Sequence, residues 1–247
     1  MSNKALFDRN SIVWRVHGDV GAMMVGGIAS LLMQMLHPSV LAGVWDHSNF
    51  RSDMHGRLRR TARFIAMTTY AERTLGLKLI AHVRSIHEGV KGVLPDGTPY
   101  RANDPSLLAW VHLTETRNFL AAWVRYADPM MRGDEQDRYF AEMAMIGQAL
   151  GADPVPRSRR EARALIEAMR PALRTDARTA EIAKLILGSR GIGMPNDMPR
   201  RLAVEAAIDL LPGWARTLHG LGMSPLERPI IRAGTWGVAQ TLRWAFR

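Results

Sequence analysis

Apolar residues in this chain recur three and four positions apart over most of its length, and this spacing most constrains the fold. Such spacing places the apolar side chains on one face of an amphipathic helix. Strand patterns, in which Val, Ile, Thr and aromatic residues alternate with polar ones between turns, are nearly absent. The sequence therefore predicts an all-α protein, a multi-helix bundle.

Proline, glycine and capping residues divide the chain into successive helices. Asp53 and Asp104 are expected N-caps, and Pro105 suits the first position of a long helix. Other helices are expected at residues 12–17, 22–36, 39–45, 55–75, 76–90, 134–150, 158–169, 176–187 and 200–211, with a tight turn at 95–97. The linker at 188–199 is the one plausible boundary, and too few residues follow it for an independent domain. We expect one helical domain over residues 1–247.

Composition excludes several classes of protein. With 47% hydrophobic and 23% charged residues, the 247-residue chain can bury a sizeable core. The absence of cysteine excludes disulfides, thiolate metal sites, iron–sulfur clusters and a cysteine nucleophile. No signal peptide is recognisable at the N-terminus, and the most apolar run, Val20–Leu36, is shorter than a spanning helix requires. We expect a cytoplasmic protein without a membrane span.

The net charge of +10 raises the question of nucleic-acid binding. Only four of the 33 basic residues are lysine, and the arginines are spread along the chain rather than gathered in one tract. No zinc finger and no basic strand interleaved with aromatic residues is present. We therefore expect no nucleic-acid partner.

One histidine occupies a position where the helical pattern calls for leucine. Ile80, Val83, His87, Val90 and Leu94 follow three-and-four spacing, so His87 lies in an apolar stripe. A buried imidazole needs a partner for its ring nitrogens, because an unsatisfied polar group costs about 2–3 kcal/mol. His87 is therefore either a hydrogen-bonded core residue or a ligand.

Polar residues of the right kind for an anionic cofactor flank His87 on the neighbouring helices. Arg57, Arg60 and Thr61 stand at i, i+3 and i+4 and are expected on one inward face, where they would suit a propionate or a phosphate. His112, with Glu115 one turn later, again stands in line with apolar residues. A single axial histidine suits haem iron. The alternative is a helical core with buried polar networks.

Other sites are weaker or excluded by pattern. The chain has no Glu-x-x-His, no His-Glu-x-x-His, no phosphate-binding P-loop, no dinucleotide fingerprint and no nucleophile elbow. A loop metal site is conceivable at Asp46, His47, Asp53 and His55, although polar loops carry such residues routinely.

Three blocks carry a family resemblance: residues 31–70, 83–116 and 210–222. Their densest motif runs from Arg57-x-x-Arg60-Thr61 through His87-x-x-Val-x-Gly to Trp-Val-His112. The chain thereby resembles the family of rubber oxygenase (latex clearing protein) and the fungal oxygenase MpaB. The similarity covers a core of about residues 16–222, which leaves further helices at 223–247, and it implies the fold of the rubber oxygenase catalytic core.

The resemblance also implies a cofactor and roles for residues. In rubber oxygenase the cofactor is haem b, and the histidine matching His87 is the proximal iron ligand. Residues matching Arg57, Arg60 and Thr61 lie on the distal side, and a histidine matching His112 is also needed. The resemblance thus implies His87 as the ligand of the haem iron, Arg57 and Thr61 as cofactor-binding residues, and Arg57, Arg60, Thr61 and His112 as catalytic residues.

Two departures shape the functional hypothesis. Arg60 stands where rubber oxygenase has a lysine that ligates iron, and a guanidinium stays protonated and is a poor iron ligand. The chain is also short and shows no export signal, which argues against extracellular rubber cleavage. We expect a haem-dependent oxygenase or peroxygenase that takes a small apolar intracellular substrate with dioxygen or peroxide. The alternative is a catalytically inactive helical protein that binds haem or a metabolite.

Overall fold

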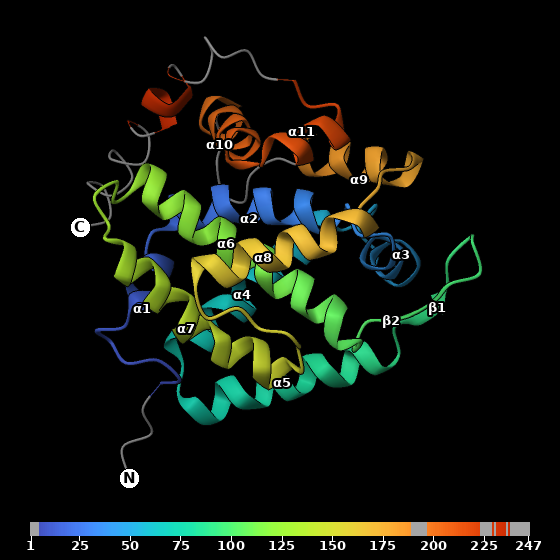
Figure 1. Cartoon of the computed structure of the whole chain (residues 1–247), viewed down its shortest axis with the longest axis horizontal. Helices are drawn as coiled ribbons and strands as arrows, with labels where there is room; N and C mark the ends of the chain where they lie inside the picture. The colour runs from blue at the N-terminus through green and yellow to red at the C-terminus, as the bar shows by residue number, and fades with distance from the viewer. Residues whose placement is uncertain (1–4, 189–196, 223–228, 230, 236, 238–247) are drawn as a thin grey trace.

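The computed structural model describes residues 5–188, 197–222, 229, 231–235 and 237, which are mostly helical (Figure 1). The first half of the chain contains α1 (Ile12–His17), α2 (Val20–Gln34), α3 (Pro38–His47), α4 (Met54–Tyr70), α5 (Arg73–Glu88) and α6 (Pro105–Tyr126). The second half contains α7 (Gly133–Leu150), α8 (Arg159–Met169), a 3-10 turn (Arg170–Ala172), α9 (Ala177–Gly188), α10 (Asp197–Leu210) and α11 (Gly213–His219). The predicted all-α class is confirmed.

A short hairpin contains the only two strands among the described residues. Strands β1 (Lys91–Val93) and β2 (Pro99–Arg101) pair antiparallel and project from the helical body (Figure 1). The predicted turn closes this hairpin, with Gly97 at φ +85° and its amide donating to the Leu94 carbonyl. The strands were not expected, because three residues are too few to show alternation.

Capping side chains start the helices where the sequence predicts. Asp53 Oδ1 accepts from the Gly56 amide at 2.8 Å at the start of α4, and Asp104 Oδ1 accepts from the Ser106 amide at 2.8 Å before α6. Ser11 and Asp19 cap α1 and α2 in the same way.

The boundary between α4 and α5 differs from the prediction. The helix expected to continue to residue 75 ends at Tyr70, and the next begins at Arg73 instead of Gly76. Gly76 lies inside α5, where a Cβ atom would come within 2.7 Å of Leu6 Cδ1. The glycine therefore accommodates the N-terminal segment and does not mark a helix start.

Helices α2 and α6 form the centre of the protein, and α10 packs on α2 from the other side (Figure 1). Buried side chains of α2 include Val25, Ala29, Leu32 and Met33, which are at most 3% exposed. At Gly26 the two helices touch through their backbones, since an added Cβ would lie 2.8 Å from the Asn118 carbonyl oxygen and 2.9 Å from Phe119 Cα. A small residue is thus required at this crossing.

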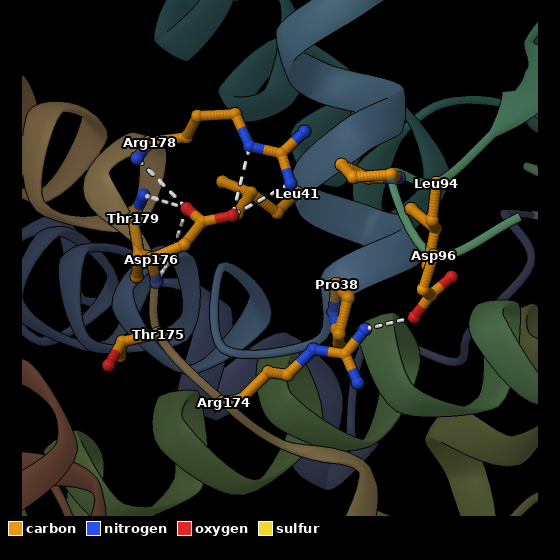
Figure 2. A pocket seen from close by; sticks show the side chains of 10 residues that line it. Pro38, Leu41, Leu94, Asp96, Arg174, Thr175, Asp176, Arg178 and Thr179 are labelled. Atoms are coloured by element: carbon orange, nitrogen blue, oxygen red, sulfur yellow. Dashed lines mark hydrogen bonds and ion pairs between the residues drawn. The ribbon is translucent and has the colours of Figure 1, made fainter. Parts of the chain in front are cut away.

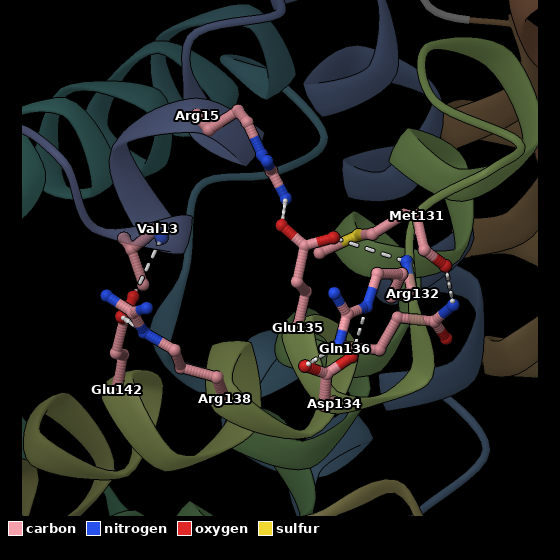
Figure 3. Close-up of polar contacts among 9 residues, drawn as sticks. All are labelled: Val13, Arg15, Met131, Arg132, Asp134, Glu135, Gln136, Arg138 and Glu142. Atoms are coloured by element: carbon pink, nitrogen blue, oxygen red, sulfur yellow. Dashed lines mark hydrogen bonds and ion pairs between the residues drawn. The ribbon is translucent and has the colours of Figure 1, made fainter.

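Helix α1 is fastened to α7 by polar contacts (Figure 3). The Val13 amide donates to Glu142 Oε2 at 3.0 Å, and Arg15 pairs with Glu135 at 2.8 Å. Because α1 also packs against α4, these contacts hold the N-terminal helix between α4 and α7.

Membrane-spanning character is limited among the described residues. No single helix there is both long and apolar enough to cross a bilayer, and α2 with α3 meets that test only as a pair bent by 103°. The predicted linker at 188–199 and the predicted helices at 223–247 lie largely outside the described residues.

Gly26 and its neighbour Gly27 provide a matched test of the α2–α6 crossing. Gly26→Ala should lower the free energy of unfolding by about 1–3 kcal/mol, because the new methyl group meets backbone that cannot move aside. Gly27→Ala should leave stability unchanged or raise it by up to about 1 kcal/mol, since its Cβ would meet only Phe119 Cε1, at 3.8 Å. Urea denaturation midpoints compare the two, and equal midpoints would contradict the close crossing.

Candidate functional site

The candidate site lies on the helix pair α4–α5. Helix α4 packs mainly against α5 and α1, and only Thr68 and Thr69 of its described side chains are fully buried. On α5 only Gly76 and Ile80 are buried. Most side chains of both helices are therefore exposed or half-buried. Both helices carry residues of the predicted site.

His87 lies in the last turn of α5, half-buried, with its two ring nitrogens in different surroundings. Nδ1 is buried and has no hydrogen-bond partner. Nε2 also makes no hydrogen bond with any described residue, and unlike Nδ1 it is not fully buried. Burial lowers the pKa of His87, Asn103 opposes that shift, and the charge of Arg57 adds to it. The ring is therefore neutral at physiological pH, with Nε2 able to bind a ligand.

Arg57 is the predicted site residue that the structure brings near His87. Its Nη1 donates to Ser48 Oγ at 3.0 Å, and it makes no ion pair with a carboxylate among the described residues. Burial lowers the pKa of Arg57, and the neighbouring charge of Arg60 lowers it further. A partly buried cation without a counter-ion is suited to bind an anionic group.

Arg60 does not share the inward face of Arg57, which corrects the expectation from helical spacing. Its side chain is 62% exposed and pairs with Asp53 at 3.2 Å and with Asn49 at 3.4 Å. The N-cap carboxylate of Asp53 draws the long guanidinium outward. Thr61, by contrast, is half-buried, and its hydroxyl donates to the Arg57 carbonyl at 3.2 Å.

His112 is buried in α6 at 4% exposure and lies against α7. A Cβ atom at Gly147 would come within 2.9 Å of His112 Nε2, and Thr116 Oγ1 lies 3.4 Å from the same nitrogen. Burial lowers the pKa of His112 to about 4, so the ring is neutral. No hydrogen bond joins it to His87 or Arg57 in the described part of the chain.

Glu115, one turn beyond His112, is a carboxyl group without a described ion-pair partner. Gln34 Nε2 donates to Glu115 Oε1 at 3.4 Å, and burial raises the pKa of Glu115 to about 7 in spite of this bond. The charge of Glu115 also contributes to the raised pKa of Tyr139, after burial. At neutral pH the carboxyl group is close to half protonated.

A buried chain of hydrogen bonds behind α4 was missed by sequence reasoning. The Thr69 hydroxyl donates to the Ile65 carbonyl at 2.7 Å. His17 Nδ1 lies 2.8 Å from Thr69 Oγ1, so His17 must be the donor to that oxygen. Burial lowers the pKa of His17 to about 3, hence its Nε2 is an acceptor and Tyr139 donates to it at 2.9 Å. The chain joins α7, α1 and α4. His17 precedes Gly-Asp in the sequence, and no local signal linked it to Thr69 or Tyr139.

A cavity of about 180 Å³ lies elsewhere, between α3, the hairpin and the start of α9 (Figure 2). Its floor includes Leu41 and Leu94, and its rim carries two arginines that are both paired. Arg174 binds Asp96 at 2.9 Å, and Arg178 binds Asp176 at 2.7 Å. This cavity includes neither His87 nor Arg57, and its charges already satisfy each other.

The described residues contain no group of three or more His, Asp or Glu side chains that could hold a metal ion by themselves. In the loop considered above, Asp46 instead accepts from Tyr100 OH at 2.7 Å and Asp53 caps α4, while the side chain of His55 lies outside the described residues. A metal held mainly by a macrocycle needs only one protein ligand, which His87 Nε2 can provide.

The fold and this site define an all-α protein with a half-buried, unpartnered histidine beside a partly buried arginine. The chain belongs to the family described as ER-bound oxygenase mpaB/B'/Rubber oxygenase, catalytic domain, whose model matches residues 14–244. The family is an oxygenase catalytic domain, so its chemistry involves a substrate and oxygen. No match was found among curated proteins or among solved structures.

The pKa of Glu115 gives a test of the buried carboxyl group. Its folded pKa of about 7 lies above the ordinary value of 4.5, so the carboxyl group favours folding when protonated and stability falls as pH rises from 4.5 through 7. Glu115→Gln should therefore be more stable than the unchanged protein at pH 8, by at most about 3 kcal/mol, and similar to it near pH 4.5.

Urea denaturation across pH 4.5–8 measures this difference. Glu205→Gln, an exposed site on α10, is the control and should leave the pH dependence unchanged. Parallel pH profiles for Glu115→Gln and the unchanged protein would show that Glu115 is not perturbed.

Proposed function

We propose that this chain is a haem b-dependent oxygenase whose iron is bound by His87 Nε2. The observation that carries the proposal is the asymmetry of the His87 ring, with Nδ1 buried and Nε2 unbonded and not fully buried. Membership of an oxygenase family supports it. When bound, haem would supply the redox chemistry that activates dioxygen or peroxide.

The chain's own residues fit such a group in charge as well as in ligand type. Arg57 is a partly buried cation without a described carboxylate partner, so it can neutralise a propionate or an anionic oxidant near His87. Thr61 follows one turn later on α4 and can hydrogen-bond to a group held by Arg57, although its hydroxyl now donates to the Arg57 carbonyl. These two residues are proposed to bind and orient, not to transfer protons.

His112 and Arg60 are proposed to act less directly on a bound group than Arg57 and Thr61. Burial keeps the His112 ring neutral, so it is suited to hold a hydrogen bond between α6 and α7 and not to supply a charge. Arg60 faces outward with Asp53, and its proposed catalytic role would require that ion pair to open. The substrate is proposed to be small and apolar.

A second candidate is a binding protein of the same fold that holds haem or a metabolite without chemistry. The outward orientation of Arg60 favours it, because a guanidinium is a poor iron ligand and this one is already paired. Turnover separates the two candidates. Consumption of oxygen or peroxide with an oxidisable apolar substrate supports the oxygenase, and a haem-loaded but inert protein supports the binding protein.

The haem proposal is tested by titrating purified protein with haemin and recording the Soret absorption. His87→Ala should weaken haemin binding at least about tenfold or shift the Soret band, because the axial nitrogen is lost. His82→Ala is the matched control, since His82 is an exposed histidine on the same helix, and it should behave as the unchanged protein. Identical spectra for the His87→Ala variant and the unchanged protein, or no haemin binding at all, would exclude this role of His87.

A further inference from the structure

Two buried polar atoms that lack hydrogen bonds belong to neighbouring side chains, His87 and Asn103. His87 Nδ1 and Asn103 Oδ1 are both buried without a partner. The only other such atoms among the described residues are the indole nitrogens of Trp14 and Trp123. A buried polar group left unpaired costs about 1–3 kcal/mol, and a hydrogen bond between these two atoms would remove both costs. The two side chains lie close enough for Asn103 to raise the pKa of His87.

The orientation of the Asn103 amide follows from the hydrogen bond that its NH₂ group makes. Asn103 Nδ2 donates to the Arg84 carbonyl at 3.0 Å, three residues before His87 on α5. The adjacent Ala102 amide donates to the Val90 carbonyl at 2.9 Å, which ties this segment to the end of α5. With its NH₂ group committed to Arg84, Asn103 can present only an acceptor, Oδ1, to His87.

An acceptor at this position determines where the proton of the His87 ring sits. An imidazole that offers one nitrogen lone pair to a metal is neutral and carries its single proton on the other nitrogen. A hydrogen bond to Asn103 Oδ1 requires that proton on Nδ1, which leaves the lone pair on Nε2. Nε2 is the nitrogen that is not buried.

We propose that Asn103 is a positioning residue that accepts a hydrogen bond from His87 Nδ1–H and thereby presents the Nε2 lone pair to a metal. This rests on the proposed function for the identity of the metal, though not for the protonation of the ring. Histidine ligands commonly donate their second nitrogen to such a partner, which fixes the tautomer and raises the basicity of the ligand. A neutral amide here withdraws less of the Nδ1 proton than a carboxylate would, so Asn103 also sets the strength of His87 as a ligand.

The haem-free protein tests the tautomer directly. Long-range ¹H–¹⁵N NMR of the imidazole should find His87 protonated at Nδ1, and Asn103→Leu should move protonation toward Nε2. A ring protonated at Nε2 in the unchanged protein, or a tautomer unaffected by Asn103→Leu, would overturn the proposal. Asn103→Asp separates the two bonds of Asn103, because it keeps an acceptor for His87 and loses the donor to Arg84.

The haemin-loaded protein tests the effect on the ligand. The reduction midpoint potential should rise in Asn103→Leu and fall in Asn103→Asp, because a carboxylate draws more of the Nδ1 proton and makes the imidazole a stronger donor to iron. A purely structural role of Asn103 predicts no such opposite shifts. Shifts of the same sign, or none, would contradict the proposal.

The two measurements also separate this proposal from the proposed function. Failure of the unchanged protein to bind haemin would exclude the haem assignment, and the NMR tautomer would still decide the role of Asn103. If haemin binding depends on His87 but the His87 tautomer does not change in Asn103→Leu, the haem assignment stands and the positioning role of Asn103 is excluded.

Discussion

The close approach of α2 and α6 at Gly26 is the contact on which the rest of the fold depends. Because no side chain separates the two backbones there, α6 lies deep in the molecule with α7 and α8 packed over it and α10 on the far side of α2. At the middle of α6, His112 is consequently removed from water and Glu115 is half-buried. Their perturbed pKa values, about 4 and about 7, are a direct result of this central position.

One buried chain of hydrogen bonds in this helical core holds α4 in place. The chain from Tyr139 through His17 to Thr69 connects α7 and α1 to the C-terminal half of α4. An ion pair and a backbone hydrogen bond between α1 and α7 reinforce the same arrangement (Figure 3). The N-terminal half of α4, which carries Arg57 and Thr61, is much less enclosed. The helix is thus anchored at one end and presents its polar residues at the other.

The open half of α4 faces the end of α5, where the His87 ring is neutral, unpartnered at Nδ1 and not fully buried at Nε2. Among the described residues no cluster of protein ligands could hold a metal unaided. A site with one good nitrogen ligand and one nearby cation is therefore suited to a cofactor that brings most of its own metal ligands. The chain belongs to an oxygenase family, and Arg60 of this chain is paired outward with Asp53.

The sequence by itself determined the helices, their caps and the residue types of the site, because helical periodicity and capping are local properties that short segments already contain. Asp53, Asp104 and the turn at Gly97 act as predicted, and His87 is found on a helix as its spacing required. The functional roles of the site residues remain predictions. Arg57 lies beside His87, and Arg60 is turned away from it. Only the tertiary structure decided that Asn103 binds the Arg84 carbonyl near the end of α5, that Glu115 binds Gln34 and that His17 bridges Thr69 and Tyr139. These pairs join residues distant along the chain or on separate elements, and only the packing of helices brings them together.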